Sequence, residues 1–376
     1  MKKILILTTR PLHNGPRIIR EIEALKGDFE IVATGTTPPH LKEVEFIHSD
    51  KFIFTHLEYT IGKIYRVFTF NRTYLGKYAT TQWKINNLLK QVKPDIVIVH
   101  EPAYLPYVFF SNQQFKVVFN AHEYHPLEVE GDMKWTRTWG KIYDTVYRKF
   151  LPKLDLLINV NQEIADQCEN EYQVKSLIIP NASKYFSSNP KTIKSDFPLL
   201  FVHHGVPNPD RKLEVMMEAF RILGGNYKLD LMLVQNGTAY YQYLERLAQG
   251  IPNVKLIPPV DYGQIIPFIS QYDLGIYSLA PISFNNQMAL PNKFFEFVQA
   301  RLPMVIGPSP VMSKYVEKYG LGKVAPDFSA EALAKTIQLL TFQDLERYRS
   351  NLERAASDLS MEQFDKNLLT TIKNLD

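Results

Sequence analysis

Short apolar runs alternate with helix-length amphipathic stretches along this chain, and the alternation occurs twice. An alternation of this kind is typical of a parallel sheet with helical crossovers. The first series of expected strands covers residues 4–7, 30–33, 95–99, 117–120, 156–160 and 177–179. The second covers residues 199–202, 229–234, 254–257, 274–277 and 303–306. We therefore predict an α/β protein of two Rossmann-like domains, whose sheets face each other across a cleft.

A polar segment separates the two series. Residues 181–198 are rich in serine, lysine and proline and show no periodicity, which is typical of a linker. A length of 376 residues is enough for two full cores. The expected boundaries are a first domain over residues 1–185, a linker over 186–198, a second domain over 199–358 and a helix over 359–376 that returns to the first domain.

Composition excludes several classes of protein. The chain has one cysteine, Cys168, so neither an intramolecular disulfide framework nor a thiolate metal cluster is expected. No run approaches the roughly 18 apolar residues that a membrane-spanning helix needs. We expect a cytoplasmic protein that is soluble or peripheral on the inner face of the cell membrane.

Two segments suggest a membrane surface. Residues 60–94 contain no acid, and seven basic residues alternate there with aromatic ones. Residues 134–153 place Trp135, Trp139, Tyr143, Val146 and Phe150 at helical spacing among lysines and arginines. We predict that the first domain contacts anionic lipid. The alternative is that this aromatic face packs on the domain's own sheet. A nucleic-acid partner is not expected, because no nucleic-acid motif accompanies the basic segment.

The stretch "VVFNAHEYHPLEV" raises the question of a zinc site. A zincin needs two histidines four residues apart on a helix, whereas His122 and His125 are three apart and follow a strand. We predict no metal here. In an open parallel sheet, ligands bind beyond the carboxyl ends of the strands, so His122, Glu123 and His125 are candidates for a binding site. His100 ends a neighbouring strand in the same way.

The string "MALPNKFFEFVQARLPMVIG", residues 288–307, opens a helix with Lys293, Glu296 and Ala300 along one face. A lysine and a glutamate three apart are usually a solvated pair. The full string, however, resembles the P-x-K-x-x-E-x-x-A-x-G-x-P-V signature of the GT-B glycosyltransferases of family 4. Arg301 stands at the position of the usual glycine.

Other strings resemble the same family. "HHGVPNPDRKLEVMMEAF" is similar to its G-R-L…K-G…E-A-F segment, and "LVQNG" is similar to its V-G-x-G turn. "NGPRIIREIEAL", "FNAHEY" and the closing "SMEQFDKNLL" resemble three further family strings. Two positions depart from the pattern, since Met288 replaces the first glutamate of an E-x7-E pair and Val206 replaces an arginine.

The resemblance implies a GT-B enzyme that moves a sugar from a UDP- or GDP-sugar to a polysaccharide, lipid-linked or other glycan acceptor. It implies retention of configuration, in which the leaving phosphate takes the acceptor's proton. The first domain would bind the acceptor and the second the nucleotide sugar. We expect no cofactor besides this substrate and no metal, because D-x-D motifs are absent from the sequence.

The chemistry assigns roles to residues. Negative charge builds on the departing diphosphate, and Arg211 and Lys212, near a helix start, would stabilise it. Glu296 would accept ribose hydroxyls, and His122 would bind the donor's sugar. The nucleotide-sugar site is expected to include Gly15, Gly205, Asn236, Gly237, Met288, Ala289, Leu290, Asn292, Lys293 and Glu296. The acceptor side is expected to include Asn14, His100, Glu123 and His125.

Two alternatives remain open from the sequence. One is a nucleotide-sugar epimerase of the same fold, which would isomerise a sugar nucleotide without an acceptor. The other is a degenerate transferase that binds nucleotide sugar without turnover, suggested by Met288 and Val206.

Overall fold

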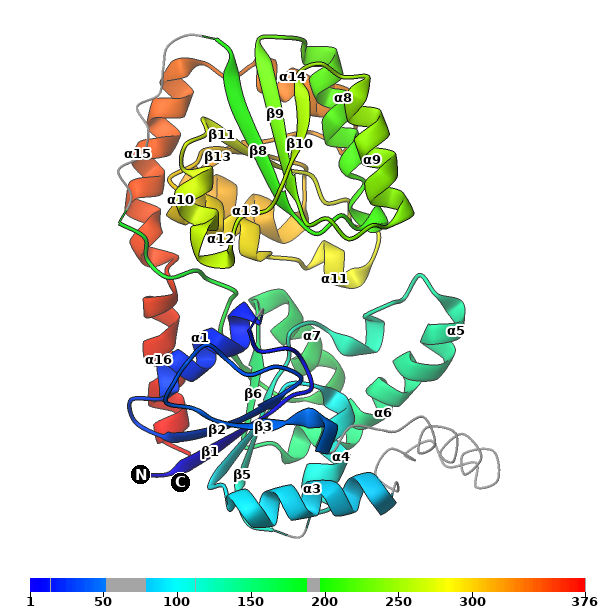
Figure 1. The fold of residues 1–376 in the computed structure, drawn as a ribbon, viewed down its shortest axis with the longest axis vertical. Coiled ribbons are helices and arrows are strands. Elements are labelled where there is room, and N and C mark those ends of the chain that lie inside the picture. Colours follow the sequence, from blue (N-terminus) through cyan, green and yellow to red (C-terminus); the bar gives the residue numbers. More distant parts are fainter. Residues whose placement is uncertain (14, 52–78, 112, 188–196, 376) are drawn as a thin grey trace. The chain divides into compact units, whose positions relative to one another are not determined.

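The computed structural model describes residues 1–13, 15–51, 79–111, 113–187 and 197–375. The chain forms two compact units (Figure 1). Unit 1 comprises Met1–Pro180 and Asp365–Asp376, and unit 2 comprises Asn181–Phe364. Part of the predicted linker, residues 188–196, lies outside the described residues.

Unit 1 is built on a parallel sheet with the strand order β3-β2-β1-β4-β5-β6-β7. The order reverses direction between β1 and β4, which are direct neighbours. The strands are β1 Lys3–Leu7, β2 Glu30–Gly35, β3 Glu45–His48, β4 Ile96–Val99, β5 Lys116–Asn120, β6 Leu156–Asn159 and β7 Ser176–Ile178.

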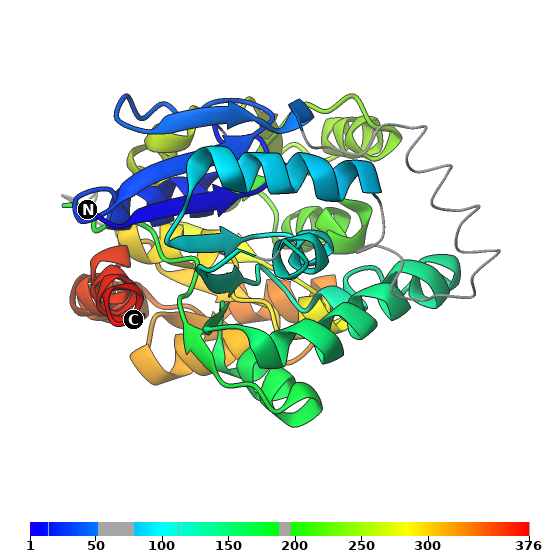
Figure 2. The same cartoon turned by 90° about the horizontal axis from the view of Figure 1, so that it is seen from below.

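Helices cover both faces of this sheet, and Figure 2 shows α16 on one side with α3 and α6 on the other. Helix α1 begins at Pro16, a favoured first helical residue, and buries Ile18, Ile22 and Leu25 against the strands. The unit 1 helices are α1 Pro16–Leu25, α3 Ala79–Val92, α4 Leu105–Phe109, α5 Met133–Trp135, α6 Lys141–Phe150 and α7 Gln162–Tyr172. Cys168 in α7 is buried.

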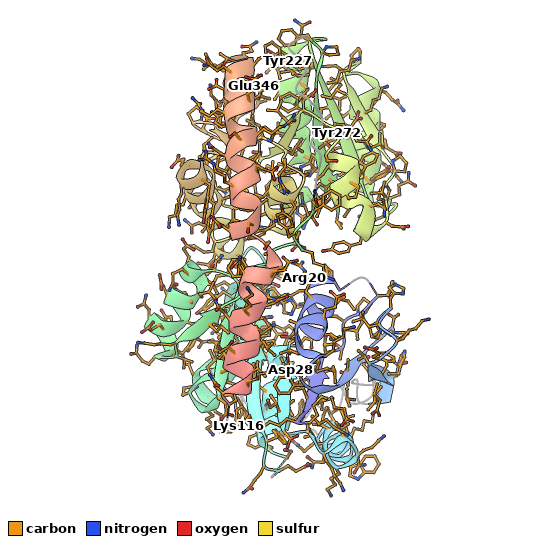
Figure 3. The ribbon with its side chains drawn as sticks, turned by 90° about the vertical axis from the view of Figure 1, so that its left-hand side faces the viewer. Arg20, Asp28, Lys116, Tyr227, Tyr272 and Glu346 are labelled. Carbon is orange, nitrogen blue, oxygen red and sulfur yellow. The ribbon has the colours of Figure 1, made fainter. Side chains whose placement is uncertain are left out.

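The last helix, α16 Met361–Lys373, follows a break after Asp358. Its Leu368 and Ile372 belong to the same core as the first strands of unit 1. Lys373 forms an ion pair with Asp28, which lies beside this helix in Figure 3. The C-terminal residues of the chain are therefore part of unit 1.

Unit 2 repeats the design with the strand order β10-β9-β8-β11-β12-β13, again entirely parallel. One core lies between the sheet and α8, α9 and α14, and the other lies against α10, α12, α13 and α15. The strands are β8 Leu199–Gly205, β9 Tyr227–Leu233, β10 Val254–Ile257, β11 Leu274–Tyr277, β12 Met304–Ile306 and β13 Gly322–Val324. The helices are α8 Leu213–Leu223, α9 Ala239–Gln249, α10 Ile265–Ile269, α11 Phe284–Gln287, α12 Asn292–Gln299, α13 Pro310–Tyr319, α14 Ala330–Gln338 and α15 Phe342–Asp358.

The α/β class and the parallel sheets confirm the sequence prediction, but two strands were missed. These are β3, with the sequence EFIH, and β13, with the sequence GKV. Both are short edge strands, and none of the residues of β13 is fully buried. A strand of this kind lacks the continuous apolar run by which the central strands of a parallel sheet are recognised.

The basic aromatic segment is only partly described, because residues 52–78 lie outside the described residues. Its last part forms α3. Within the described residues, no helix is long and apolar enough to cross a membrane.

Candidate functional site

The first candidate site lies where the strand order of unit 2 reverses, at the carboxyl ends of β8 and β11. Open α/β sheets bind ligands in the crevice beyond the strand ends at such a point. Strand β8 ends with His203, His204 and Gly205, and β11 ends with Tyr277. Helix α12 contributes Lys293, whose Nζ atom lies 4.8 Å from the centre of the Tyr277 ring. Three elements therefore converge on one ammonium group.

Lys293 is a buried cation, with an exposed fraction of 6%. Its ammonium forms no hydrogen bond with any other described residue. Gly205, with φ of +135°, leaves space for it, since a Cβ atom there would lie 2.9 Å from Nζ. Burial and the nearby charge of Arg211 lower the pKa of Lys293 to about 7, although Glu296 opposes this shift. A bound anion would restore the full charge of this group.

Glu296 follows Lys293 by three residues in α12 and is also buried, with an exposed fraction of 4%. The reading of these two residues as a solvated pair is therefore wrong. One carboxylate oxygen of Glu296 lies 3.3 Å from Nε2 of His204. This contact is not a hydrogen bond, and Nε2 of His204 has no hydrogen-bond partner among the described residues. Burial, followed by the charge of Lys293, lowers the pKa of His204 to about 3 and keeps its imidazole neutral.

Arg211 belongs to the same cluster. Its NH1 group donates a hydrogen bond to the Val206 carbonyl oxygen at 3.0 Å. Asn208 and Pro209 open a single 3-10 turn, Pro209–Arg211, which precedes helix α8. The turn ends at Lys212, which is exposed and has a left-handed φ of 45°, and α8 then begins at Leu213. The predicted cation pair is thus divided, with Arg211 at the cluster and Lys212 in solvent.

The remaining predicted residues of unit 2 lie near the N-termini of two helices, α9 and α12. Asn236 and Gly237 follow β9, and the Asn236 side chain accepts a hydrogen bond from the hydroxyl of Thr238, the capping residue of α9. Gly237 has φ of +65°, which glycine adopts without strain. The other group precedes or opens α12 and contains Met288, Ala289, Leu290 and Asn292.

Unit 1 has its own cluster at the ends of β4 and β5, which is a chain of hydrogen bonds. Nδ1 of the buried His100 lies 2.7 Å from Nε2 of His122, and Nε2 of His100 lies 2.9 Å from Oε2 of Glu21. Asn120 donates to the other oxygen of Glu21 at 2.7 Å. Arg17 donates a hydrogen bond to the side-chain amide oxygen of Asn120, Oδ1, at 2.6 Å. His122 is therefore held by a side chain rather than by the backbone.

Glu123, His125 and Glu128 are three possible metal ligands whose donor atoms lie within 4.8 Å of one another. Burial, followed by the charges of Arg10 and Arg17, lowers the pKa of His125 to about 3. His125 packs in an aromatic cluster, with Nδ1 2.8 Å from the Tyr147 hydroxyl.

Glu123 is half-buried, and its carboxyl group is weakly acidic. Burial and the like charge of Glu128 raise the pKa of Glu123 to about 7, against the opposing charge of Arg10. Glu123 therefore exchanges a proton near neutral pH and can both donate and accept hydrogen bonds to a polar ligand.

Taken together, the unit 2 cluster offers two cations beside one carboxylate. Guanidinium and ammonium groups bind phosphate oxygens, while a carboxylate accepts hydrogen bonds from hydroxyl groups. This combination suits a ligand that carries an anionic group next to hydroxyls.

Comparison with known proteins gives the fold of the chain and a family that matches part of it. Residues 17–182 match the model of Glycosyltransferase Family 4. The sucrose-phosphate synthase of Thermosynechococcus elongatus has a similar structure, with a TM-score of 0.75 at 12% identity over 100% of this chain and 99% of that chain. The chain therefore has the fold of this synthase, as expected for the predicted GT-B architecture, and part of its sequence matches a glycosyltransferase family.

Other solved structures share the fold of this chain. The Anabaena protein HepE in complex with UDP and glucose has a TM-score of 0.73 at 14% identity, covering 100% of both chains. A glycosyltransferase from Rickettsia africae has a TM-score of 0.73 at 13% identity, over 100% of this chain and 98% of that chain. A search of curated protein sequences found no match.

The structure brings some predicted residues together and separates others. Gly205, Arg211, Lys293 and Glu296 form one cluster in unit 2. In unit 1, His100 contacts His122 directly, and Glu123 lies close to His125. Gly15 caps α1, where a Cβ atom would lie 3.0 Å from the Pro11 carbonyl oxygen. Asn14 lies outside the described residues.

Sequence reasoning missed several residues of these clusters, which are Arg10, Arg17, Glu21, Asn120, His203, His204 and Tyr277. A signal existed for two of them. Arg17 and Glu21 are four residues apart, so they share one face of α1, although neither belongs to its apolar stripe.

Arg301 shows why the family signature has a glycine at this position. Its φ is +55°, in the left-handed region that glycine adopts most easily. The fully buried side chain is nevertheless well bonded, because it donates to the Gln299 carbonyl oxygen at 2.6 Å and pairs with Glu353 at 3.0 Å. These contacts offset the strain of a non-glycine residue.

Proposed function

We propose that this chain is a glycosyltransferase that moves a sugar from a UDP-sugar to a polysaccharide, lipid-linked or other glycan acceptor, with retention and without a metal ion. The observation that supports it most is the buried Lys293 ammonium, which has no hydrogen-bond partner among the described residues. UDP is preferred over GDP because HepE, of the same fold, binds UDP and glucose.

The diphosphate of the donor would lie between Lys293 and Arg211. When the glycosyl bond breaks, negative charge grows on the leaving diphosphate, and fixed cations in a buried site lower the barrier. Because Lys293 carries only part of its charge in the free protein, it gains a proton as the anion binds. Glu296, one turn along α12, would accept the ribose hydroxyls.

Retention needs no protein base in this proposal. The departing phosphate oxygen takes the proton of the acceptor hydroxyl as that hydroxyl attacks the same face of the sugar. The glycosyl bond to the diphosphate breaks, the bond to the acceptor oxygen forms, and UDP leaves with the proton.

A thermal-shift panel of UDP, GDP, ADP and their sugar conjugates tests the donor. A ligand that binds only the folded state stabilises it by about 2.7 kcal/mol at a hundred times its dissociation constant. We expect UDP and UDP-sugars to raise the melting temperature with increasing concentration. A panel in which no uridine compound shifts the transition, or in which GDP-sugars shift it more, would reject this donor.

Chelation tests the absence of a metal. We expect EDTA to leave the rate of sugar transfer unchanged, because Lys293 and Arg211 meet the diphosphate charge. The rate is measured as UDP release with acceptor present, before and after dialysis against chelator. Loss of activity that magnesium or manganese restores would contradict the metal-free mechanism.

The aromatic face of α5 and α6 is only partly available to a membrane. Val146 and Phe150 are buried in unit 1, so for these residues the packing alternative is correct. Trp135 and Trp139 are half-buried and contact the Tyr143 ring. The adjoining surface exposes 63% of Met133 and several basic side chains, including Lys134, Lys141, Arg148 and Lys149.

We predict that the protein co-sediments with anionic but not with neutral liposomes at low salt. Each basic residue near an anionic surface adds about 1 kcal/mol, and salt screens this attraction. Replacing Arg66, Arg72 and Lys77, which lie outside the described residues, with glutamate should abolish sedimentation and leave UDP binding unchanged. Equal binding to neutral vesicles, or none to anionic ones, would indicate a soluble acceptor instead.

A further inference from the structure

A chain of side-chain hydrogen bonds runs from Arg17 through Asn120, Glu21 and His100 to His122. We propose that this relay fixes His122 in one tautomer, with the proton on Nε2 and a free lone pair on Nδ1, so that His122 accepts a hydrogen bond from a sugar hydroxyl. Glu21 is then a positioning residue that acts through His100. The sugar as the ligand of His122 rests on the proposed function, whereas the tautomer of His122 does not depend on it.

The direction of the relay is set at Arg17, because a guanidinium can only donate hydrogen bonds. NH2 of Arg17 lies 2.6 Å from Oδ1 of Asn120 and 3.2 Å from the Ala121 carbonyl oxygen. Asn120 must therefore turn its carbonyl oxygen toward Arg17. Its amide group then faces Glu21 and donates to Oε1 of that residue at 2.7 Å.

The orientation of Asn120 determines which atom donates in each of the following hydrogen bonds. Glu21 accepts from Asn120, and a carboxylate that accepts on both oxygens also accepts the Nε2 proton of His100 at 2.9 Å. His100 then has a lone pair on Nδ1, which accepts the Nε2 proton of His122 at 2.7 Å. A second proton on His122 is disfavoured, since burial and the charge of Arg17 hold its pKa well below the usual value. The hydrogen positions follow from the network.

The free end of the relay is accessible. His122 is only half-buried, whereas His100 and Glu21 are buried. No described residue forms a hydrogen bond with Nδ1 of His122. A lone pair at this position binds a group that donates a proton, such as a hydroxyl, and repels phosphate and carboxylate oxygens. The relay therefore selects for a hydroxyl-bearing sugar at His122.

Exchanging an acid and an amide tests the direction of the relay. In Glu21→Gln, the oxygen of the introduced amide must face the Asn120 amide group, so the introduced NH2 group faces His100. Both histidines then reverse their tautomers, and His122 carries its proton on Nδ1. Adding Asn120→Asp restores the original direction, because the introduced carboxylate accepts from Arg17 and from the NH2 group at position 21. The amide oxygen at position 21 then faces His100 again. Glu23→Gln, on the same helix and outside the relay, is the matched control.

Nitrogen-15 NMR of the histidine side chains in the free protein reads the tautomers without any nucleotide sugar, with signals assigned by a His122→Asn variant. We expect an Nε2 proton on His122 in wild type, in Glu23→Gln and in the double variant, and an Nδ1 proton in Glu21→Gln. In Glu21→Gln, Nδ1 of His122 carries a proton and no longer accepts a hydrogen bond from the sugar hydroxyl. We therefore expect kcat/KM to fall about tenfold or more in Glu21→Gln and to recover in the double variant.

The possible results separate the relay, the contact between His122 and the sugar, and the proposed function. An Nδ1 proton on His122 in the wild type overturns the relay, even if Glu21→Gln does not fold. Unchanged tautomers in folded Glu21→Gln do the same. Reversed tautomers with unchanged kcat/KM overturn the contact between His122 and the sugar. A protein that shows the expected tautomers but no turnover with any UDP-sugar refutes the proposed function and leaves the tautomer assignment standing.

Discussion

Replacing Lys293 with methionine is expected to weaken the binding of a UDP-sugar about a hundredfold and to raise the stability of the free protein. The first effect follows because charge-assisted bonds to phosphate contribute about 1.5–3 kcal/mol. The second follows because the buried ammonium has no hydrogen-bond partner among the described residues, and methionine fills a similar volume without a charge. Calorimetric titration and thermal melting measure the two effects.

The pH dependence of ligand affinity and of protein stability tests whether Lys293 causes both effects. Since the pKa of Lys293 is about 7 in the free protein, ligand binding above this pH requires proton uptake, and affinity should fall by up to about tenfold per pH unit. The folded pKa lies below the value of about 10.4 in unfolded chains. The penalty for burying the charge is therefore complete below pH 7 and disappears as pH rises from about 7 toward 10. Both trends should be absent in the Lys293→Met variant.

Lys318 provides the matched control, because its Nζ also lies over a tyrosine ring, that of Tyr319, at 5.2 Å, but the side chain is exposed. Lys318→Met should change neither binding nor its pH dependence. Wild-type affinity in Lys293→Met, or the same loss in both variants, would remove Lys293 from the phosphate site.

Local pattern was sufficient for most of the fold but not for burial at the site. The spacing of Lys293 and Glu296 is the same in a solvated pair and in a buried one. What distinguishes them is Gly205 at the end of β8 and Tyr277 at the end of β11, which the sequence does not connect to α12. The resemblance to family 4 supplied the residues, and the structure supplied their environment.

The relay in unit 1 could not be predicted from the sequence, for a different reason. Glu21 meets His100 and Asn120, which lie 79 and 99 positions further along the chain. Only the parallel pairing of β4 with β5, together with the packing of α1 on the sheet, brings these side chains together. A helix pattern shows that α1 has a polar face, but it does not show that Glu21 on that helix is buried.

Glu296→Gln is the second change with a large expected effect. We expect at least a tenfold loss in affinity for UDP and for UDP-sugars alike, because a carboxylate that accepts two ribose hydroxyls becomes an amide with one acceptor. The loss should be equal for UDP and for its sugar conjugates, because both carry the ribose. Stability should change little, because glutamine has nearly the same shape and His204 beside it is already neutral.

Glu346→Gln is the matched control, since Glu346 is exposed on α15 (Figure 3) and should tolerate the change. Titration calorimetry with UDP and one UDP-sugar separates the possible roles of Glu296. A loss confined to the UDP-sugar would place Glu296 at the transferred sugar instead of the ribose. Because Met288 stands where family 4 has its other glutamate, Glu296 is the one carboxylate that the signature retains in this chain. Wild-type affinity for both ligands would therefore leave the site without an acceptor for nucleotide hydroxyls and contradict the assignment of α12.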